Sequence, residues 1–538
     1  MTVRLDRPEI DPDSIKAWSS HLGKPVPDPV ALRRDLAGGT LPEAFARTAA
    51  AAGSAPAFFF PDGGITHAAL DQAAARAQSN LLRLGAGPGR AVLLSATTAL
   101  STLIAYLAVL RTGAAVALAN PLYTPSELSR LIAASDADLA IATGEGVKRL
   151  AAASIPVREL IGLAVEDRQH ASMLLFDGSE EPAPVVSLNP DAPAVLAFTS
   201  GTTGEAKCVP LSHRNLLASI RGVMWAWRWS ANDRLIHALP IAHQHGLGGV
   251  HATLLAGSQA TLLGRFDPDQ LLDTIVSKAT SVLFAVPTIY RRLVEEAFDR
   301  LALLKRLRLF TSGSSALPLV LGQQLTEEIG TAPLERYGTT ESGLDVSNLY
   351  EGPRVLGTVG MPLPGLELAL GDGDGKTVSV GEVGEVLVRG PQVFNGYWGD
   401  RTGDDPFIFD WFRTGDLGVQ EATGHLRLVG RTKEVIVTGG LNVYPKEVEA
   451  VLAGLPGVED VAVVGVPSSA WGEEVVAFVV GQPTSEEDLR QAAAAELVSY
   501  KIPKRFIRLE KIPRNELGKV SREGLLAEGV VPPETPGI

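Results

Sequence analysis

Over roughly its first 430 residues, the chain alternates short β-rich runs with alanine- and leucine-rich segments of helical periodicity. The run Ala91–Leu94 precedes the helical pattern of Ala99–Leu110, and Ser281–Ala285 precedes Thr288–Phe298. Strands that alternate with helices at this spacing favour parallel sheets covered by helices. Because 538 residues exceed what one hydrophobic core normally supports, we expect an α/β protein with two or more folding units.

The pattern changes twice further along the chain. Between Leu363 and Val388 the strands become short and are separated by Gly-Asp turns, which indicates a β-rich subdomain. After Glu434, the strand-like Val435–Thr438 and the helical Pro445–Leu452 open a compact α+β unit. We therefore predict a large N-terminal domain of residues 1–431, with layered α/β subdomains and the β-rich subdomain, and a small α+β C-terminal domain of residues 432–538.

Charge and cysteine content exclude several classes of protein. The net charge of −13 argues against a nucleic-acid partner, because such partners call for broad basic surfaces. The single cysteine, Cys208, excludes an intramolecular disulfide framework and a cysteine zinc cluster. The acidic N-terminus is unlike a signal peptide, and hydroxyl side chains interrupt the long apolar stretch Ala91–Leu110. We therefore expect a cytoplasmic protein without a membrane span.

A run of glycines and hydroxyl side chains, closed by one lysine, stands near the middle of the chain: Thr199, Ser200, Gly201, Thr202, Thr203, Gly204, Glu205, Ala206 and Lys207. Glycines let backbone N–H groups turn toward an anion, hydroxyls donate further hydrogen bonds, and the lysine adds a positive charge. The run follows the strand-like stretch Ala194–Phe198, as a phosphate-binding loop does. Its glycine spacing differs from the Walker pattern, and the run alone suits a flexible surface loop equally well.

Two later segments combine a carboxylate with hydroxyls or a glycine turn. In Glu335–Ser342, Glu341 stands beside threonines, an oxygen-rich setting that suits a hard divalent cation bridging to phosphate. In Trp411–Leu417, Asp416 is placed to accept hydrogen bonds from both ribose hydroxyls, as carboxylates do in other nucleotide-binding folds. At this point an acidic surface turn and an ordinary Asx turn are the alternatives.

Two more segments complete an ordered set: Leu428–Glu434, which continues to Gly439–Pro445, and Pro513–Lys519 near the C-terminus. In this order and spacing, the set resembles the adenylate-forming superfamily of acyl-CoA synthetases, adenylation domains and luciferases, over nearly the whole chain. Other segments agree with the resemblance: Asn120–Thr124, Leu239-Pro240 with His243 and His245, Thr311–Ser315, and Gly357–Gly360.

The resemblance implies a role for each matching residue. It places the phosphates of ATP at Thr199–Lys207 and Mg²⁺ at Thr199 and Glu341. It also implies that Asp416 binds the ribose. Further contacts to the nucleotide and the acyl end are implied for Gly313, Ser314, Ser315, Tyr337, Gly338, Thr339, Thr340 and Arg431.

The small domain is implied to be mobile and to supply catalytic groups. Lys433 matches the hinge on which that domain swings, and Lys519 matches the lysine that reaches the carboxylate during adenylation. Together with Mg²⁺, Lys207 and Lys519 would neutralise the charge that builds on the leaving pyrophosphate. Gly439 and Gly440 match part of the tunnel for the pantetheine arm of CoA.

The acyl site is less defined by the sequence. His243 and His245 suit either an active-site role or hydrogen-bonded packing, and Trp225, Trp227 and Trp229 suit either the wall of an acyl tunnel or the core.

One stretch, Gly338–Gly365, looks closest to malonyl-CoA synthetases. A dicarboxylic acid would need a cation inside the acyl pocket, for which Arg291 and Arg292 are candidates. Both are equally compatible with a position facing solvent.

The chain also departs from the pattern of the superfamily. Ala206 and Cys208 stand where proline and glycine are usual, Thr339 stands where methionine is frequent, and Ala242 stands where an aromatic residue often precedes the histidine. None of these changes removes a charge that the chemistry needs, but they bring the efficiency of ATP binding into question.

The leading hypothesis is an acyl-CoA synthetase that activates a carboxylic acid with ATP to an acyl-AMP and transfers the acyl group to CoA. Because the chain ends about twenty residues after Lys519, we expect CoA or a separate carrier protein as the acceptor. The alternatives are a variant that mainly thiolates a supplied acyl-adenylate, a free-standing amino-acid adenylating enzyme, a luciferase-like oxygenase and a non-catalytic adenylate-binding protein. The sequence names neither the acid nor the oligomeric state.

Overall fold

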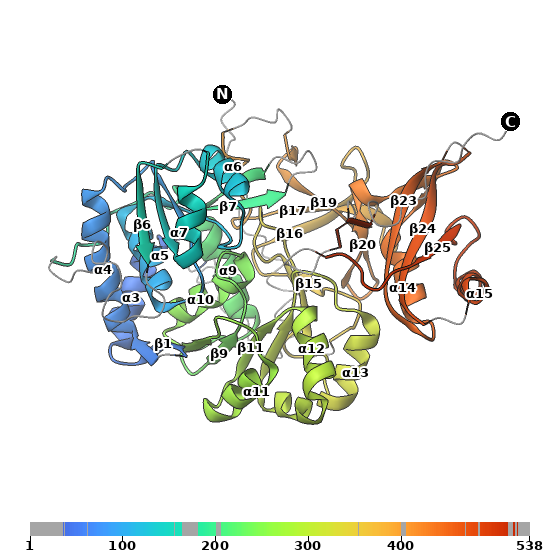
Figure 1. Ribbon diagram of the computed structural model, residues 1–538, viewed down its shortest axis with the longest axis horizontal. Helices are drawn as coiled ribbons and strands as arrows, with labels where there is room; N and C mark the ends of the chain where they lie inside the picture. Colours follow the sequence, from blue (N-terminus) through green and yellow to red (C-terminus); the bar gives the residue numbers. More distant parts are fainter. Residues whose placement is uncertain are drawn as a thin grey trace.

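The computed structural model describes residues 36, 38–61, 63–154, 157–163, 181–200, 206–352, 354–399, 405–468, 470–482, 485–514, 520–521 and 524–525. Within these ranges the chain forms a large N-terminal domain and a small C-terminal domain, which Figure 1 shows at its left and right, respectively. The α/β class and the two-domain organisation predicted from the sequence are confirmed. The predicted boundary between residues 431 and 432 falls at the end of a strand and stays a prediction.

The first sheet of the large domain has six strands in the order β6-β5-β3-β4-β7-β8. Their bounds are Glu159–Leu163, Leu139–Thr143, Ala91–Ser95, Ala115–Leu118, Pro193–Ser200 and Ala206–Ser212. Neighbouring strands are parallel except for β7 and β8, which form an antiparallel pair. The helices that alternate with these strands are α4 (His67–Arg83), α5 (Leu100–Thr112), α6 (Pro125–Ser135) and α7 (Gly144–Ala151).

The second sheet has nine strands in the order β15-β14-β13-β12-β11-β9-β10-β1-β2. Their bounds are Met361–Pro362, Val346–Ser347, Leu334–Tyr337, Leu309–Ser312, Val282–Ala285, Arg234–His237, Gln259–Leu262, Pro56–Phe60 and Gly63–Thr66. The strands from β13 to β1 pair in parallel. The associated helices are α3 (Leu41–Ala52), α9 (His213–Ala226), α10 (Gln244–Ala256), α11 (Pro268–Ser277), α12 (Pro287–Ala297), η1 (Phe298–Arg306) and α13 (Leu319–Ile329).

The predicted β-rich subdomain is an antiparallel five-stranded sheet. It contains β16 (Glu367–Gly371), β17 (Val383–Arg389), β18 (Phe407–Ile408), β19 (Trp411–Gln420) and β20 (Leu426–Arg431). Side chains of this sheet and of both α/β sheets join one large hydrophobic cluster, so the three subdomains share a core.

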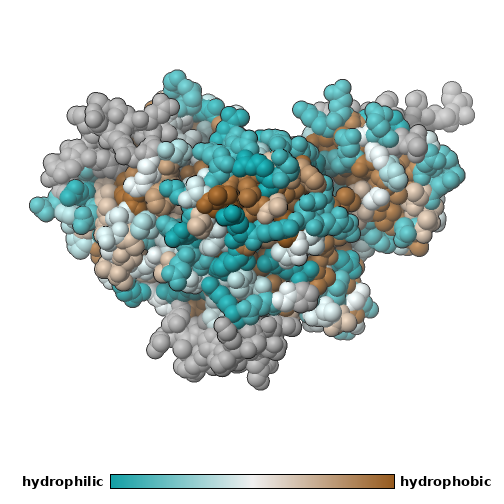
Figure 2. All heavy atoms as spheres, turned by 90° about the horizontal axis from the view of Figure 1, so that it is seen from below, coloured by the Kyte–Doolittle hydropathy of each residue, from teal (hydrophilic) through white to brown (hydrophobic). Residues whose placement is uncertain are grey.

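In the part of the small domain that the structure describes, there are a five-stranded sheet and two helices. The strands are β21 (Ile436–Thr438), β22 (Leu441–Val443), β23 (Val458–Ser468), β24 (Gly472–Gly481) and β25 (Arg505–Arg508), and the helices are α14 (Pro445–Ala453) and α15 (Glu486–Glu496). Its apolar side chains form two hydrophobic clusters separate from that of the large domain. Figure 2 shows the small domain as a lobe at the right that is set apart from the large body.

Among the helices in the described ranges, none reaches the combined length and hydropathy that a membrane crossing requires.

Candidate active site

The two ends of the predicted phosphate loop face each other in the β7–β8 hairpin. Thr199 pairs with Lys207 and Ser200 pairs with Ala206, so the last residues of β7 and the first of β8 lie side by side. The predicted site residues between them, which are Gly201, Thr202, Thr203 and Gly204, lie outside the described residues. The hairpin therefore brings Thr199 and Lys207 to one edge of the first sheet.

The unusual Cys208 does not point toward this edge. Its side chain is buried in the hydrophobic cluster of the first sheet, and burial raises the pKa of the thiol to about 12. The neutral thiol therefore behaves as a small apolar side chain, which explains why a side chain is accepted at this position.

Tyr397 brings Lys207 and Glu341 together, although they are far apart in the sequence. Its hydroxyl donates a hydrogen bond of 3.1 Å to Glu341 Oε1, and Lys207 Nζ lies 4.7 Å from the centroid of its ring. Glu341 is partly buried, and this burial raises the pKa of its carboxyl, opposed by the Tyr397 hydrogen bond. The sequence offered no signal for Tyr397 beyond its place in an aromatic stretch.

Asp416 lies at the centre of a second cluster. Its Oδ2 accepts a hydrogen bond of 2.7 Å from the hydroxyl of Tyr337, and its Oδ1 accepts one of 2.8 Å from Arg431 Nε. The β19–β20 register sets Asp416 opposite Arg431, and β13 carries Tyr337 to them from the second sheet. Asp416 raises the pKa of Arg431, because its carboxylate stabilises the guanidinium. The structure thus joins three predicted nucleotide-site residues.

Glycines allow the nearby loops to approach one another. A Cβ on Gly338 would lie 1.9 Å from the carbonyl oxygen of Gly343, and one on Gly313 would lie 2.4 Å from Arg336 Nε. A side chain at Gly338 would collide with the main chain, and one at Gly313 would displace the side chain of Arg336. Ser314 has φ of 68°, a left-handed conformation that costs energy outside glycine, and Ser315 beside it is half-buried.

The turn after Tyr337 is held by its own hydroxyl groups. Thr339 Oγ1 lies 2.7 Å from Ser342 Oγ, which donates to the buried carboxyl of Asp345. The carbonyl of Thr340 accepts a hydrogen bond from the side chain of Gln244 at the start of α10. The threonine found in place of methionine therefore takes part in the polar structure of this turn.

A cavity of about 50 Å³ lies beside this turn, between α9 and α10. It is lined by Leu216, Ser219, Ile220, Val223, Trp227, Gln244, His245, Leu247, Gly248, His251, Phe284, Arg336, Gly343 and Leu344. Most of the wall is apolar, and Arg336 is the cation in it.

Two side chains of the cavity carry polar atoms that are hidden from solvent and have no partner among the described residues. These atoms are Nε and Nη2 of Arg336 and Nε2 of His245, whose Nδ1 lies 3.3 Å from Ser314 Oγ. Burial lowers the pKa of Arg336 only to about 10, so it stays charged at neutral pH. Burial, Arg336 and His237 hold the pKa of His245 well below its usual value, so this histidine is neutral. The cavity is therefore positively charged.

His243 precedes α10 as its N-cap residue and does not line the cavity, whereas His245 does. Of the three tryptophans, Trp227 is part of the wall, and Trp225 and Trp229 are not. Trp227 is also a core residue, since it is 1% exposed and packs edge-on against Phe284 with ring centroids 5.7 Å apart. Trp227 is thus a core residue that also lines the cavity, and the interpretation of this cavity as an acyl tunnel stays a prediction.

Neither predicted candidate for the cation of the acyl pocket lines the cavity. Arg292 pairs with Glu296 along α12 and lies over the ring of Phe266. Arg291 instead lies 3.8 Å from Asp460 of the small domain. The sequence reasoning missed Arg336 because it stands inside a motif that was interpreted as a nucleotide site, beside Glu335. Because side chains alternate between the two faces of a sheet along a strand, the neighbours Glu335 and Arg336 of β13 lie on opposite faces of the second sheet.

The small domain contributes a glycine turn near the domain junction. Gly439 and Gly440 have φ of 57° and 79° and form the β21–β22 turn, where the Gly439 N–H donates to the Trp471 carbonyl. Lys433 lies in the short turn η2 (Thr432–Glu434), directly after β20. Lys519 lies outside the described residues.

Comparison with protein families agrees with this geometry. A family model described as AMP-binding enzyme matches residues 45–398, and one described as AMP-binding enzyme C-terminal domain matches residues 447–519. The chain therefore belongs to the family of AMP-binding enzymes.

Similar proteins assign the chain to the acyl-CoA synthetase branch of this family. The malonate–CoA ligase of Xenopus laevis, named as mitochondrial, is 35% identical over 76% of this chain and 78% of its own length. The oxalate–CoA ligase of Arabidopsis thaliana is 32% identical over 85% of this chain and 92% of its own. The ATP-bound MatB of Rhodopseudomonas palustris is 33% identical, with a TM-score of 0.84 over 91% of this chain and 99% of that one. The predicted class, an AMP-forming acid–CoA ligase, is confirmed.

Proposed function

We propose that this enzyme joins a short dicarboxylic acid of the malonate class to CoA, using ATP and passing through an acyl-adenylate. The observation that carries the proposal is Arg336, whose hidden Nε and Nη2 atoms have no partner among the described residues and which lines the cavity. Hidden guanidinium nitrogens without an acceptor are costly, and a carboxylate is the ligand that pairs with a guanidinium through two hydrogen bonds. An acid with one carboxylate would leave this group unpaired while the other end reacted.

The size of the cavity and the named acids of two relatives support the same substrate class. The cavity of about 50 Å³ between α9 and α10 is small, and its lining of mostly apolar side chains around Arg336 suits a short acid. The acids in the names of the Xenopus laevis and Arabidopsis thaliana relatives, malonate and oxalate, both carry two carboxylates.

The nucleotide is proposed to lie across the clusters around Asp416 and Glu341. Asp416, already held by Tyr337 and Arg431, would accept the ribose hydroxyls. Lys207, on the strand that follows the phosphate loop, would pair with the phosphates. Gly313, Ser314, Ser315 and the turn from Gly338 to Thr340 would enclose the adenine and the acyl phosphate.

Magnesium fits the donor set at this site. Glu341 and Thr199 offer a carboxylate and a hydroxyl, and Mg²⁺ is usually held by one or two carboxylates together with phosphates and water. Among the described residues, no cluster of three or more histidine, cysteine, aspartate or glutamate side chains could hold a metal ion. When bound, Mg²⁺ would neutralise charge on the phosphates.

The small domain is proposed to supply Lys519 for adenylation and the Gly439–Gly440 turn for the entry of CoA, with Lys433 as the hinge. Its separate hydrophobic clusters support a rigid-body movement, because the core of the large domain stays intact when the small domain turns. Because neither glycine has a Cβ, the backbone of this turn can pass close to a ligand, and both residues adopt the positive φ that the turn needs.

A panel of acids tests the proposal. With ATP, Mg²⁺ and CoA, the enzyme is offered malonate, oxalate, succinate, propionate and indoleacetate, and both pyrophosphate and acyl-CoA are measured. We expect kcat/KM for malonate to exceed that for propionate by at least roughly a hundredfold, because a site built to pair a polar group rejects the analogue that lacks it. Equal turnover of propionate and malonate contradicts the proposal.

The same panel separates the alternatives. An enzyme that releases no pyrophosphate with any acid but thiolates supplied malonyl-AMP performs only the second half-reaction, and a protein without turnover in both assays is a binder. CoA is proposed as the acceptor of the acyl group. An assay in which a carrier protein replaces CoA tests whether the enzyme also transfers the acyl group to such a protein. The cytoplasmic location stays a prediction, since one relative is named as mitochondrial.

A further inference from the structure

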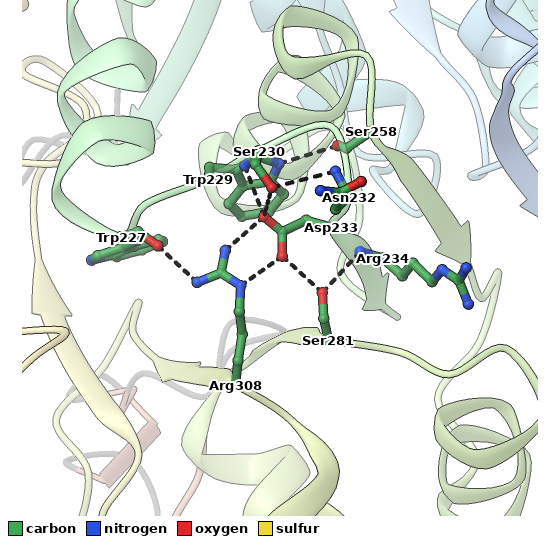
Figure 3. A network of polar contacts seen from close by, with 9 residues as sticks. All are labelled: Trp227, Trp229, Ser230, Asn232, Asp233, Arg234, Ser258, Ser281 and Arg308. Carbon is green, nitrogen blue, oxygen red and sulfur yellow. Dashed lines mark hydrogen bonds and ion pairs between the residues drawn. The ribbon is translucent and has the colours of Figure 1, made fainter.

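An ion pair between the buried Asp233 and the half-buried Arg308 caps the end of α9, the helix that forms one wall of the cavity. Asp233, just before β9, accepts hydrogen bonds from Arg308 Nε at 2.6 Å and from Arg308 Nη2 at 2.7 Å, one on each carboxylate oxygen. The third nitrogen of the guanidinium, Nη1, donates to the main-chain carbonyl of Trp227 at 2.8 Å. Figure 3 shows Arg308 between Asp233 on one side and the Trp227 carbonyl on the other.

The Trp227 carbonyl has no hydrogen-bond donor within its own helix. Trp227 is the C-cap residue of α9, and the last carbonyls of a helix have no partner within it. A guanidinium at this end also interacts favourably with the partial negative charge of the helix terminus. Arg308 therefore fixes both the position of the terminus and the direction of the Trp227 main chain.

The other partners of Asp233 make the cap rigid. Asp233 also accepts from the Ser230 N–H at 2.8 Å and from the Ser281 hydroxyl at 2.8 Å, and its side chain is 4% exposed. Burial opposes its ionisation, but Arg308 and the Ser230 hydrogen bond outweigh burial and lower the pKa of this carboxyl. The carboxylate is thus charged and fully engaged at neutral pH.

The capped terminus leads directly into the cavity. The indole of Trp227 lines it and donates from Nε1 to Ser347 Oγ at 2.8 Å. Leu216, Ile220 and Val223 of α9 line the same wall, so a shift of the helix along its axis moves all four side chains together. The backbone directly after Trp227 is also strained, because Arg228 adopts a left-handed conformation with φ of 51°.

We propose that Asp233 and Arg308 are positioning residues for acid selectivity: by capping α9 they hold the Trp227 wall at the distance that admits a short acid and excludes a branched one. Neither residue lines the cavity, so the effect passes through Trp227 and α9. This proposal rests on the proposed function for the identity of the acid. The role of Asp233 and Arg308 in positioning α9 concerns only the size of the acid that the cavity admits.

Arg308→Lys is the informative variant. Lysine keeps the charge and can reach Asp233, but its single ammonium does not reproduce the fork that bonds Asp233 twice and Trp227 once. We expect the ratio of kcat/KM for malonate to that for butylmalonate to fall about threefold to tenfold, the range that one net hydrogen bond supplies. KM for ATP is expected to stay within about twofold, because the nucleotide clusters are not touched.

Arg300→Lys is the matched control. Arg300, on η1 just before Arg308, also bonds two aspartate oxygens, of Asp269 and Asp273, but both of these aspartates are exposed and none of the three residues lines the cavity. This variant should leave the selectivity ratio unchanged. A second variant, Trp227→Phe, keeps an aromatic wall without the Ser347 hydrogen bond and should lower the ratio in the same direction as Arg308→Lys.

One outcome overturns the proposal: Arg308→Lys lowers the melting temperature while the selectivity ratio stays at the wild-type value. Failure of the proposed function is seen separately, as wild-type enzyme that turns over propionate but not malonate. In that case the same ratio is measured for propionate against hexanoate. A fall in Arg308→Lys then supports the positioning role without a dicarboxylate, and an unchanged ratio contradicts it.

Discussion

The proposed nucleotide side and the proposed acyl side of the site differ in how their polar groups are satisfied. Around Asp416, both carboxylate oxygens already have partners, Tyr337 and Arg431. In the cavity, Arg336 and His245 carry hidden nitrogen atoms that no described residue pairs. Since unpaired buried polar atoms are costly, the proposed acyl side would gain more from its ligand than the cluster around Asp416 would. Under the proposed function, the Asp416 cluster is arranged before the nucleotide binds, whereas the polar groups of the cavity are completed by the acid.

The largest effect is expected from removing the unpaired cation. Arg336→Met should lower kcat/KM for the dicarboxylic acid by roughly a hundredfold or more, because the second carboxylate would then be buried without a partner. KM for ATP should change little, and the loss with propionate should be much smaller. Arg292→Met, at an arginine paired along α12 outside the cavity, is the control and should behave as wild type. Equal losses of kcat/KM with malonate and with propionate would contradict the proposed pairing of Arg336 with the second carboxylate.

An intermediate effect is expected on the prearranged side. Asp416→Asn keeps the shape but removes the charge that Arg431 faces at 2.8 Å, and it weakens an acceptor for the ribose. We expect KM for ATP to rise roughly tenfold while acid selectivity stays constant. Asp410→Asn, which removes an exposed partner of Arg389 on the neighbouring turn, should leave both unchanged. A change of acid preference in Asp416→Asn would show that the two sides are not independent.

The smallest effect concerns pH. Burial raises the pKa of Glu341, and the hydrogen bond from Tyr397 works against this shift. Because the ionised carboxylate is the form proposed to support Mg²⁺ and ATP, activity should fall as the pH drops through this pKa. Tyr397→Phe removes the opposing hydrogen bond, so the pKa rises further and the fall should begin at higher pH. The pH profile of pyrophosphate release measures this shift.

Tyr500→Phe serves as the control for that profile, since Tyr500 also has a lysine beside its ring but lies in the small domain. An acidic limb that stays in place or moves to lower pH in Tyr397→Phe would contradict the assignment of Glu341.

The sequence predicted the layers of the fold because strand and helix periodicities are local. The pattern at Ala99–Leu110 corresponds to α5 (Leu100–Thr112), and that at Thr288–Phe298 corresponds to α12 (Pro287–Ala297). The motifs around Glu341 and Asp416 each lie within one contiguous turn, so the sequence could point to them, and their roles at the site stay predictions.

Contacts between distant segments were not predictable. Which of Glu335 and Arg336 faces the cavity depends on the register of β13 and on the space left by Gly313, and one sequence shows neither. Arg291 and Arg292 looked suitable for the cavity, but the phase of α12 directs one to Asp460 and the other to Glu296. Tyr397 and the pair of Asp233 and Arg308 act through partners that are distant in the chain.

The most direct test of the account is a crystal structure of the full chain with ATP, Mg²⁺ and malonate. The account predicts that one carboxylate lies at the α-phosphate and that the other lies within hydrogen-bond distance of Arg336 Nε or Nη2, inside the cavity between α9 and α10. A second carboxylate that points to solvent, or that binds another cation while Arg336 stays unpaired, would contradict it.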